Sequence, residues 1–74
     1  MGADRTAAQL DIVLNGAAAT TAARTVAELV AQQRLTALKV ATAVNGHFVP
    51  EAKRATTALN HGDRVEIVSP RQGG

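Results

Sequence analysis

The sequence predicts an α+β fold, in which a mixed sheet of about five short strands carries one helix across one face. Apolar residues alternate with polar or small residues in several short segments, which is the two-residue period of half-buried strands. Residues 25–34 combine a helix-capping sequence with apolar residues at helical spacing. Asn-Gly pairs at 15–16 and 45–46 are typical of the tight turns that join hairpin strands.

The first strand is predicted over residues 10–14, where Leu10, Ile12 and Leu14 point to one side and Val13 to the other. The Asn-Gly pair at 15–16 tolerates the positive φ that a reversal of the chain requires. The Ala- and Thr-rich segment 18–24 is therefore expected to return beside it as a short edge strand.

A helix is predicted over residues 26–34. Thr25 to Glu28 form a capping box, in which the Thr25 hydroxyl accepts from the Glu28 amide and Glu28 reaches back to the Thr25 amide. Val26, Leu29 and Val30 then fall on one face. A helix this short is stable only when such a face packs on a sheet.

A second hairpin is predicted from strands at 40–44 and 47–49, joined by Asn-Gly and ended by Pro50, which lacks an amide donor. Residues 51–59 are expected to form an irregular or short helical crossover. Its inward residues are predicted to be Ala52, Ala55 and Leu59.

After a turn at 60–63, the last strand is predicted over residues 64–69. Val65 and Ile67 are expected on one face of it, with Glu66 and Val68 on the other. The strand-rich domain thus spans residues 10–69, between a flexible extension at 1–9 and an extended tail at 70–74.

The composition argues against an enzyme. Of the 74 residues 46% are hydrophobic, but 16 are Ala, and Leu, Ile, Val and Phe number only 17. This suffices for one sheet face and one helix stripe, but not for a core that also encloses a substrate pocket. The absence of Cys excludes disulfides and thiolate metal sites. With no segment of membrane-spanning length and no signal-peptide core, a cytoplasmic location is expected.

The charged and metal-binding residue types predict no site of their own. The net charge is only +2, the Lys and Arg residues are spread along the chain, and Phe48 is the one aromatic residue. Clustered cations with aromatic platforms, which nucleic-acid binding generally needs, are missing. His47 and His61 lack a third ligand at metal-type spacing, and Asp63 with Glu66 gives no evidence of an acid/base pair. We therefore expect no catalytic residue, no metal, no bound cofactor, no nucleic acid and no membrane partner.

The sequence ends in Gly73-Gly74, the feature that most suggests chemistry. A terminal Gly presents a carboxylate with no Cβ beside it, so it can enter a narrow channel of a partner protein. The five residues beyond Ser69 reach at most about 17 Å when extended. The carboxylate could then be activated as an acyl-adenylate in a partner's active site.

Several segments, taken in order along residues 10–74, match the pattern of a known family. They are Leu14-Asn15-Gly16, Thr25 to Leu29, Val40 to Gly46, Val49-Pro50, Leu59 to Val68 and Gln72-Gly73-Gly74. The most specific part is the last strand followed closely by Gly-Gly. With these segments the chain resembles the ThiS family of thiamine-biosynthesis sulfur carriers, which have the ubiquitin-like β-grasp fold.

The resemblance implies a β-grasp fold and a sulfur-carrier cycle. A ThiF-like adenylating enzyme would use ATP and Mg to adenylate the Gly74 carboxylate, and a sulfur donor would convert it to a thiocarboxylate. A ThiG-like thiazole synthase would then take the sulfur. Arg71, Gln72 and Gly73 would be recognised as the tail. The chain departs from the family in its extension at 1–9 and in lacking an aromatic residue soon after Pro50.

A docking face for the partner is predicted on the side of the sheet away from the helix. Val13 and Val68 are expected there, with Arg64 and Arg71 as a polar rim. Scattered surface valines are the alternative interpretation.

Other functions remain open from the sequence. The small subunit of molybdopterin synthase and other ubiquitin-like sulfur carriers share the predicted fold and tail. A non-covalent β-grasp binding module would not need the terminal glycine, and a protein-modifying tag would be joined through Gly74 to lysines.

Overall fold

A computed structural model describes residues 9–34 and 39–69 of the chain. It contains strands, one α-helix and one 3₁₀-helix. In chain order these are β1 (Leu10–Leu14), β2 (Ala17–Thr21), α2 (Val26–Gln32), β3 (Ala41–Val44), β4 (His47–Val49), η1 (Glu51–Thr56) and β5 (Arg64–Val68).

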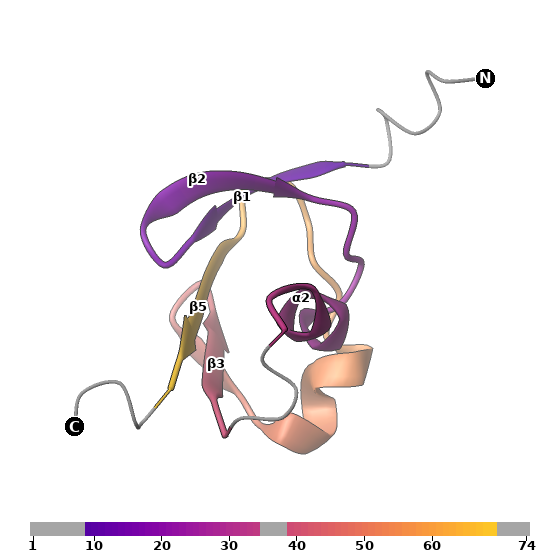
Figure 1. Ribbon diagram of the computed structural model, residues 1–74, viewed down its shortest axis with the longest axis vertical. Coiled ribbons are helices and arrows are strands. Elements are labelled where there is room, and N and C mark those ends of the chain that lie inside the picture. Colours follow the sequence, from indigo (N-terminus) through magenta and orange to yellow (C-terminus); the bar gives the residue numbers. More distant parts are fainter. Residues whose placement is uncertain (1–8, 35–38, 70–74) are drawn as a thin grey trace.

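The strands form one mixed sheet in the order β2-β1-β5-β3-β4 (Figure 1). The last strand, β5, lies at the centre, parallel to β1 and antiparallel to β3. Each outer strand is joined to its neighbour by a tight antiparallel hairpin. The fold predicted from the sequence, a mixed sheet of five strands with one helix, is confirmed, and it is a β-grasp.

The two hairpins use the same turn chemistry. Asn15 and Asn45 have φ of 51° and 52°, and the glycines that follow have φ of 85° and 83°. Positive φ at both central residues defines the turn whose twist matches that of the flanking strands. The predicted positions of both turns are therefore confirmed, and β2 begins one residue earlier and ends earlier than the predicted segment 18–24.

Helix α2 begins directly after the predicted capping residue Thr25, but it differs from the prediction in two details. The Glu28 amide donates to Thr25 Oγ1 over 3.2 Å, as expected. The Glu28 carboxylate, however, accepts from the Arg24 amide over 2.6 Å, where the sequence predicted the Thr25 amide. An isolated bridge between Thr25 and Ala58 keeps the preceding chain extended, with Arg24 within reach of Glu28.

The helix also ends at Gln32, before the predicted Arg34. Arg34 has φ of 61°, and a left-handed residue terminates the helical hydrogen-bond pattern. The position of this boundary therefore depends on a backbone conformation that apolar spacing does not reveal.

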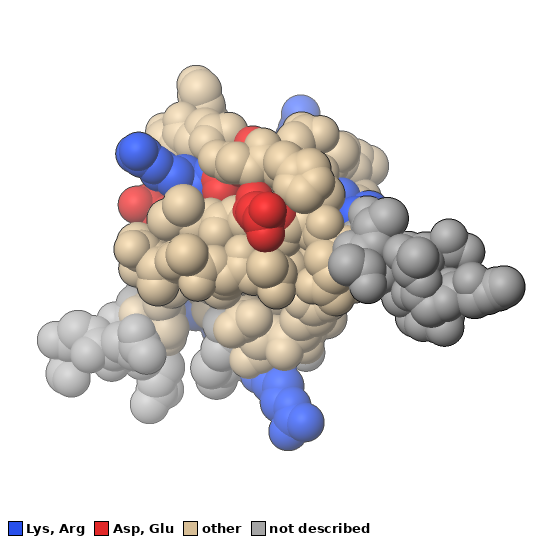
Figure 2. All heavy atoms as spheres, turned by 90° about the horizontal axis from the view of Figure 1, so that it is seen from above, with Lys and Arg blue, Asp and Glu red and all other residues tan. Residues whose placement is uncertain are grey.

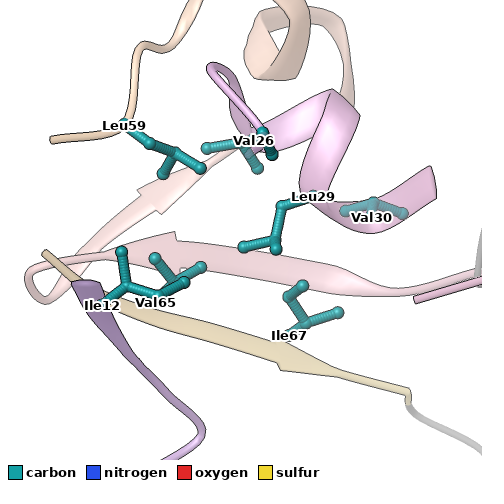
Figure 3. Close-up of a cluster of buried hydrophobic side chains, with 8 residues drawn as sticks. Ile12, Val26, Leu29, Val30, Leu59, Val65 and Ile67 are labelled. Carbon is teal, nitrogen blue, oxygen red and sulfur yellow. The ribbon is translucent and has the colours of Figure 1, made fainter. Parts of the chain in front are cut away.

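The core lies between α2 and one face of the sheet (Figure 3). The helix side chains point toward the strands, and Leu59 closes one end of the cluster. Its labelled members are Ile12, Val26, Leu29, Val30, Leu59, Val65 and Ile67. The inward residues predicted for the first strand, the helix and the last strand thus form one hydrophobic cluster.

The crossover between β4 and β5 contradicts part of the prediction. Leu59 is buried as expected, but Ala52 and Ala55 are exposed. Residues 51–56 form a 3₁₀-helix, in which residues three apart share a face, and the face with these alanines lies toward solvent. Arg54 makes the contact with the sheet instead: its Nη2 donates to the Val40 carbonyl over 2.6 Å and its Nε to Thr42 Oγ1 over 3.1 Å.

In the part of the chain that the structure describes, neither helix has the length and apolar character that a membrane crossing needs. The predicted extension at 1–9, apart from residue 9, and the predicted tail at 70–74 lie outside the described residues.

Candidate functional site

Strand β5 precedes the C-terminal segment, residues 70–74, in which the sequence predicts the chemistry. It is the central strand of the sheet and ends at Val68, one residue before the last described residue, Ser69. The predicted sulfur attachment residue Gly74 and the predicted tail-recognition residues Arg71, Gln72 and Gly73 lie outside the described residues. What the structure places is therefore the base of the tail and the surface around it.

The open face of the sheet is formed by alternate residues of each strand. Val65 and Ile67 are buried under the helix, so Arg64, Glu66 and Val68 lie on the opposite side. All of these outward side chains are exposed, and Val68 has 54% of its surface accessible.

The predicted docking residues divide between the two ends of β5. Val13 is half-buried and lies opposite Arg64 in the parallel register of β1 and β5. Val68 lies four residues farther along β5, about 13 Å away at the usual strand rise. Val13 and Arg64 therefore form one cluster, and Val68 belongs to another.

Phe48 is the open-face residue that the sequence analysis did not assign. It lies in β4 with 68% of its surface exposed. Phe48 pairs with Ala43 in β3, while Ala41 in the same strand pairs with Val68. We call these residues, Ala41, Ala43, Phe48 and Val68, the apolar strip. The alternation that places Val49 inward could have revealed that Phe48 points outward.

Asparagine side chains hold β5 at both of its ends. Asn15 Oδ1 accepts from the Ile67 amide over 2.9 Å, and Asn15 Nδ2 donates to the Ile67 carbonyl over 3.1 Å. At the other end, Asn45 Oδ1 accepts from the Arg64 amide over 2.9 Å, and Asn45 Nδ2 donates to Asp63 Oδ1 over 3.0 Å. Each asparagine belongs to a hairpin turn, so both hairpins are fastened to the strand between them.

Asp63 and His61, both in the 60–63 turn, have structural partners. Buried Asp63 accepts from the Asn60 amide over 2.9 Å as well as from Asn45 Nδ2, so its carboxylate closes the turn. His61 Nδ1 accepts from the Asp11 amide over 3.1 Å. Within residues 9–34 and 39–69, no group of three His, Asp or Glu side chains is arranged as a metal site would require.

The Lys and Arg side chains do not gather into one patch on the surface that Figure 2 shows. They lie at separate points around the molecule, with acidic side chains between some of them (Figure 2). This view therefore shows neither the continuous basic track nor the acidic hollow that a polyanion or a cation would require.

Comparisons with known proteins identify the family and the fold of the chain. The model of the ThiS family matches residues 12–74, which is most of the chain and includes its end. No curated protein matched the sequence.

A solved structure of the thiamine biosynthesis protein ThiS from Geobacter metallireducens has the same fold. The two structures have a TM-score of 0.71 at 23% sequence identity, over 81% of this chain and 93% of that chain. The resemblance inferred from the motifs is thereby confirmed: the chain belongs to the ThiS family.

Proposed function

We propose that this chain is a sulfur carrier of thiamine thiazole biosynthesis and that the Gly74 carboxylate carries the sulfur. A partner enzyme would use ATP with Mg to form an acyl-adenylate at Gly74, releasing pyrophosphate. A sulfur donor would then displace AMP and leave a thiocarboxylate, whose sulfur is passed to a thiazole synthase. The chain acts as the substrate of these enzymes, and ATP and Mg belong to the partner.

The observation that carries this proposal is the family match, which spans residues 12–74 and so includes Gly74. The chemistry of the end is consistent with it. A carboxylate oxygen is a poor leaving group, and adenylation converts it into a good one. Glycine at both terminal positions leaves no side chain to obstruct a narrow active-site channel.

The position of β5 adds a geometric argument. The five residues after Ser69 span at most about 17 Å when extended. An enzyme that binds the Gly74 carboxylate must therefore come close to the end of β5, where Val68 is exposed. We assign the apolar strip as the surface that the adenylating enzyme covers. Val13 and Arg64, at the far end of the same sheet face, would form the rim of that contact surface.

The test is intact-mass measurement after incubation with a ThiF-like enzyme, Mg-ATP and a sulfide source. We expect a mass increase that corresponds to exchange of one oxygen for sulfur, mapped to Gly74 by fragmentation. Deletion of Gly74 should abolish the increase. Gly73→Ala is the matched variant, because it keeps the chain length and adds only one methyl group; it should slow the reaction. The proposal would be contradicted if the wild-type chain stays unmodified while the same enzyme modifies a known carrier under the same conditions.

A second experiment identifies the acceptor. The thiocarboxylate form, labelled with ³⁵S, is mixed with a ThiG-like thiazole synthase and its other substrates. Transfer of label into a thiazole product is the expected result. Label that stays on the protein would favour another carrier. Isopeptide conjugates of Gly74 with lysines, formed with release of the labelled sulfur as sulfide, would favour a protein-modifying tag.

A further inference from the structure

The parallel pairing of β1 and β5 stops before β5 ends. Its last backbone hydrogen bond is donated by the Asn15 amide to the Val65 carbonyl over 2.9 Å. Asn15 then adopts φ of 51° and the chain turns away into β2. Ile67 and Val68 consequently extend beyond the last residue of β1.

The Asn15 carboxamide continues the pairing where the backbone leaves. In a parallel ladder, the Ile67 amide would donate to the carbonyl of residue 15, and the Ile67 carbonyl would accept from the amide of residue 17. Asn15 Oδ1 and Nδ2 take these two positions, at 2.9 and 3.1 Å from the Ile67 nitrogen and oxygen. One side chain thus replaces a donor and an acceptor of the missing strand.

The contact with Ile67 lies three residues before the tail begins at residue 70. On its other side, the end of β5 pairs with β3 through Thr42↔Ile67 and Ala41↔Val68. The Ile67 amide and carbonyl both bond to Asn15, so without this carboxamide both would lose their hydrogen-bond partner, and the end of β5 would be paired with β3 alone. Because of Asn15, β5 has hydrogen-bonded neighbours on both sides as far as Ile67, two residues before Ser69.

We propose that Asn15 is a positioning residue for the carrier reaction. By holding Ile67 it keeps Val68 on the open face and determines the direction in which the chain leaves the sheet toward Gly74. The proposal rests on the proposed function, since it assumes that one enzyme binds the open face at Val68 and the Gly74 carboxylate at the same time. A misplacement of about 1 Å at a reacting group can cost about 100-fold in rate, so restraint at the base of the tail affects its far end.

Asn45 provides a matched control. It has the same φ, the same following glycine and the same side-chain contact with a β5 amide, but at Arg64, where β5 begins. It also bonds buried Asp63, so its loss should cost the fold at least as much as the loss of Asn15. Glycine is the suitable replacement at both positions, because it removes the carboxamide and accepts positive φ without strain.

The experiment compares Asn15→Gly with Asn45→Gly in two measurements. The first is the steady-state rate of adenylation by the ThiF-like enzyme. We expect Asn15→Gly to lower kcat/KM about tenfold more than Asn45→Gly does, although both variants remain folded at the assay temperature. Equal losses, or a larger loss in Asn45→Gly, would overturn the positioning role.

The second measurement is independent of the enzyme. Amide hydrogen exchange and ¹⁵N relaxation should show faster exchange at Ile67 and larger motion at Ser69 in Asn15→Gly but not in Asn45→Gly. The same behaviour in both variants would overturn the proposal whatever the kinetics show. If the wild-type chain is not adenylated, the proposed function fails and the role of Asn15 in the carrier reaction fails with it. If the wild-type chain is adenylated and Asn15→Gly is adenylated at the same rate, the positioning role is refuted while the proposed function stands.

Discussion

The two faces of the sheet differ in what their side chains contribute, although they share the same strands. On the covered face, Val65 is fully buried against the helix and Ile67 nearly so. On the open face, Val68 and Phe48 expose most of their side chains. Neighbouring residues of β5 thus differ in their surroundings: those facing the helix are buried in the core, and those facing away are exposed. Mutations on the two faces should therefore affect different measurements.

The largest expected effect is on the covered face. Leu29→Ala removes the largest of the fully buried side chains and leaves a cavity between helix and sheet, at a cost of about 2–5 kcal/mol in the free energy of unfolding. Phe48→Ala removes more atoms from the open face and should cost about 0.5 kcal/mol. Urea denaturation of both variants measures the difference. Similar losses of stability would show that the open face also contributes to the core.

The next largest effect is expected where η1 covers the sheet. Arg54→Met keeps an unbranched apolar stem but removes the hydrogen bonds to the Val40 carbonyl and Thr42 Oγ1. Since bonds from a charged donor are worth more than neutral ones, we expect a loss of about 2 kcal/mol in urea denaturation. Lys53→Met, at the exposed neighbouring position, should change stability by less than about 0.5 kcal/mol.

Charging the open face tests the docking surface. Val68→Asp should weaken binding to the ThiF-like enzyme about tenfold, or about 1.4 kcal/mol, because it places a carboxylate in an apolar contact. Isothermal titration calorimetry gives the Kd. Thr20→Asp is the control: it adds the same charge at an exposed position on β2, the opposite edge of the sheet from the apolar strip. An affinity unchanged by Val68→Asp would exclude Val68 from the interface.

The smallest effect is expected at the start of α2. Thr25→Ala removes the acceptor for the Glu28 amide and should cost about 1 kcal/mol, with little effect on partner binding. Thr25→Ser keeps the hydroxyl and should restore most of the stability. Thermal unfolding followed by circular dichroism compares the three proteins. A Thr25→Ser variant as unstable as Thr25→Ala would mean that the threonine methyl group, and not the cap, is what matters.

Features that depend on local pattern could be predicted from the sequence. The alternation in 10–14 and 64–68, the Asn-Gly turns and the capping threonine each identify an element by interactions within a few residues. The two-residue period of the strands and the helical spacing of α2 also predicted which of their residues face the core. Gly73-Gly74 drew attention by its own chemistry, the resemblance to a family added the roles of the tail residues, and these roles stay predictions.

The errors occurred where local pattern was ambiguous. Ala52 and Ala55 were predicted to face inward, but alanine carries too little apolar surface to decide between the two sides of a short helix. The guanidinium of Arg54 decided it, because it finds acceptors in β3. The end of α2 was set by the left-handed conformation of Arg34, which no apolar period indicates.

Local pattern is enough to locate the strands, their turns and the residues that are apolar enough to be buried, because period and turn chemistry act over a few residues. The position of β5 between β1 and β3, and the pairing of Asn15 with Ile67, 52 residues away, follow from the folded structure and not from local pattern. Strand order and side-chain pairing depend on long-range contacts, and any strand of suitable pattern satisfies the local rules. The joining of a hairpin turn to the base of the tail is therefore a property of the folded chain alone.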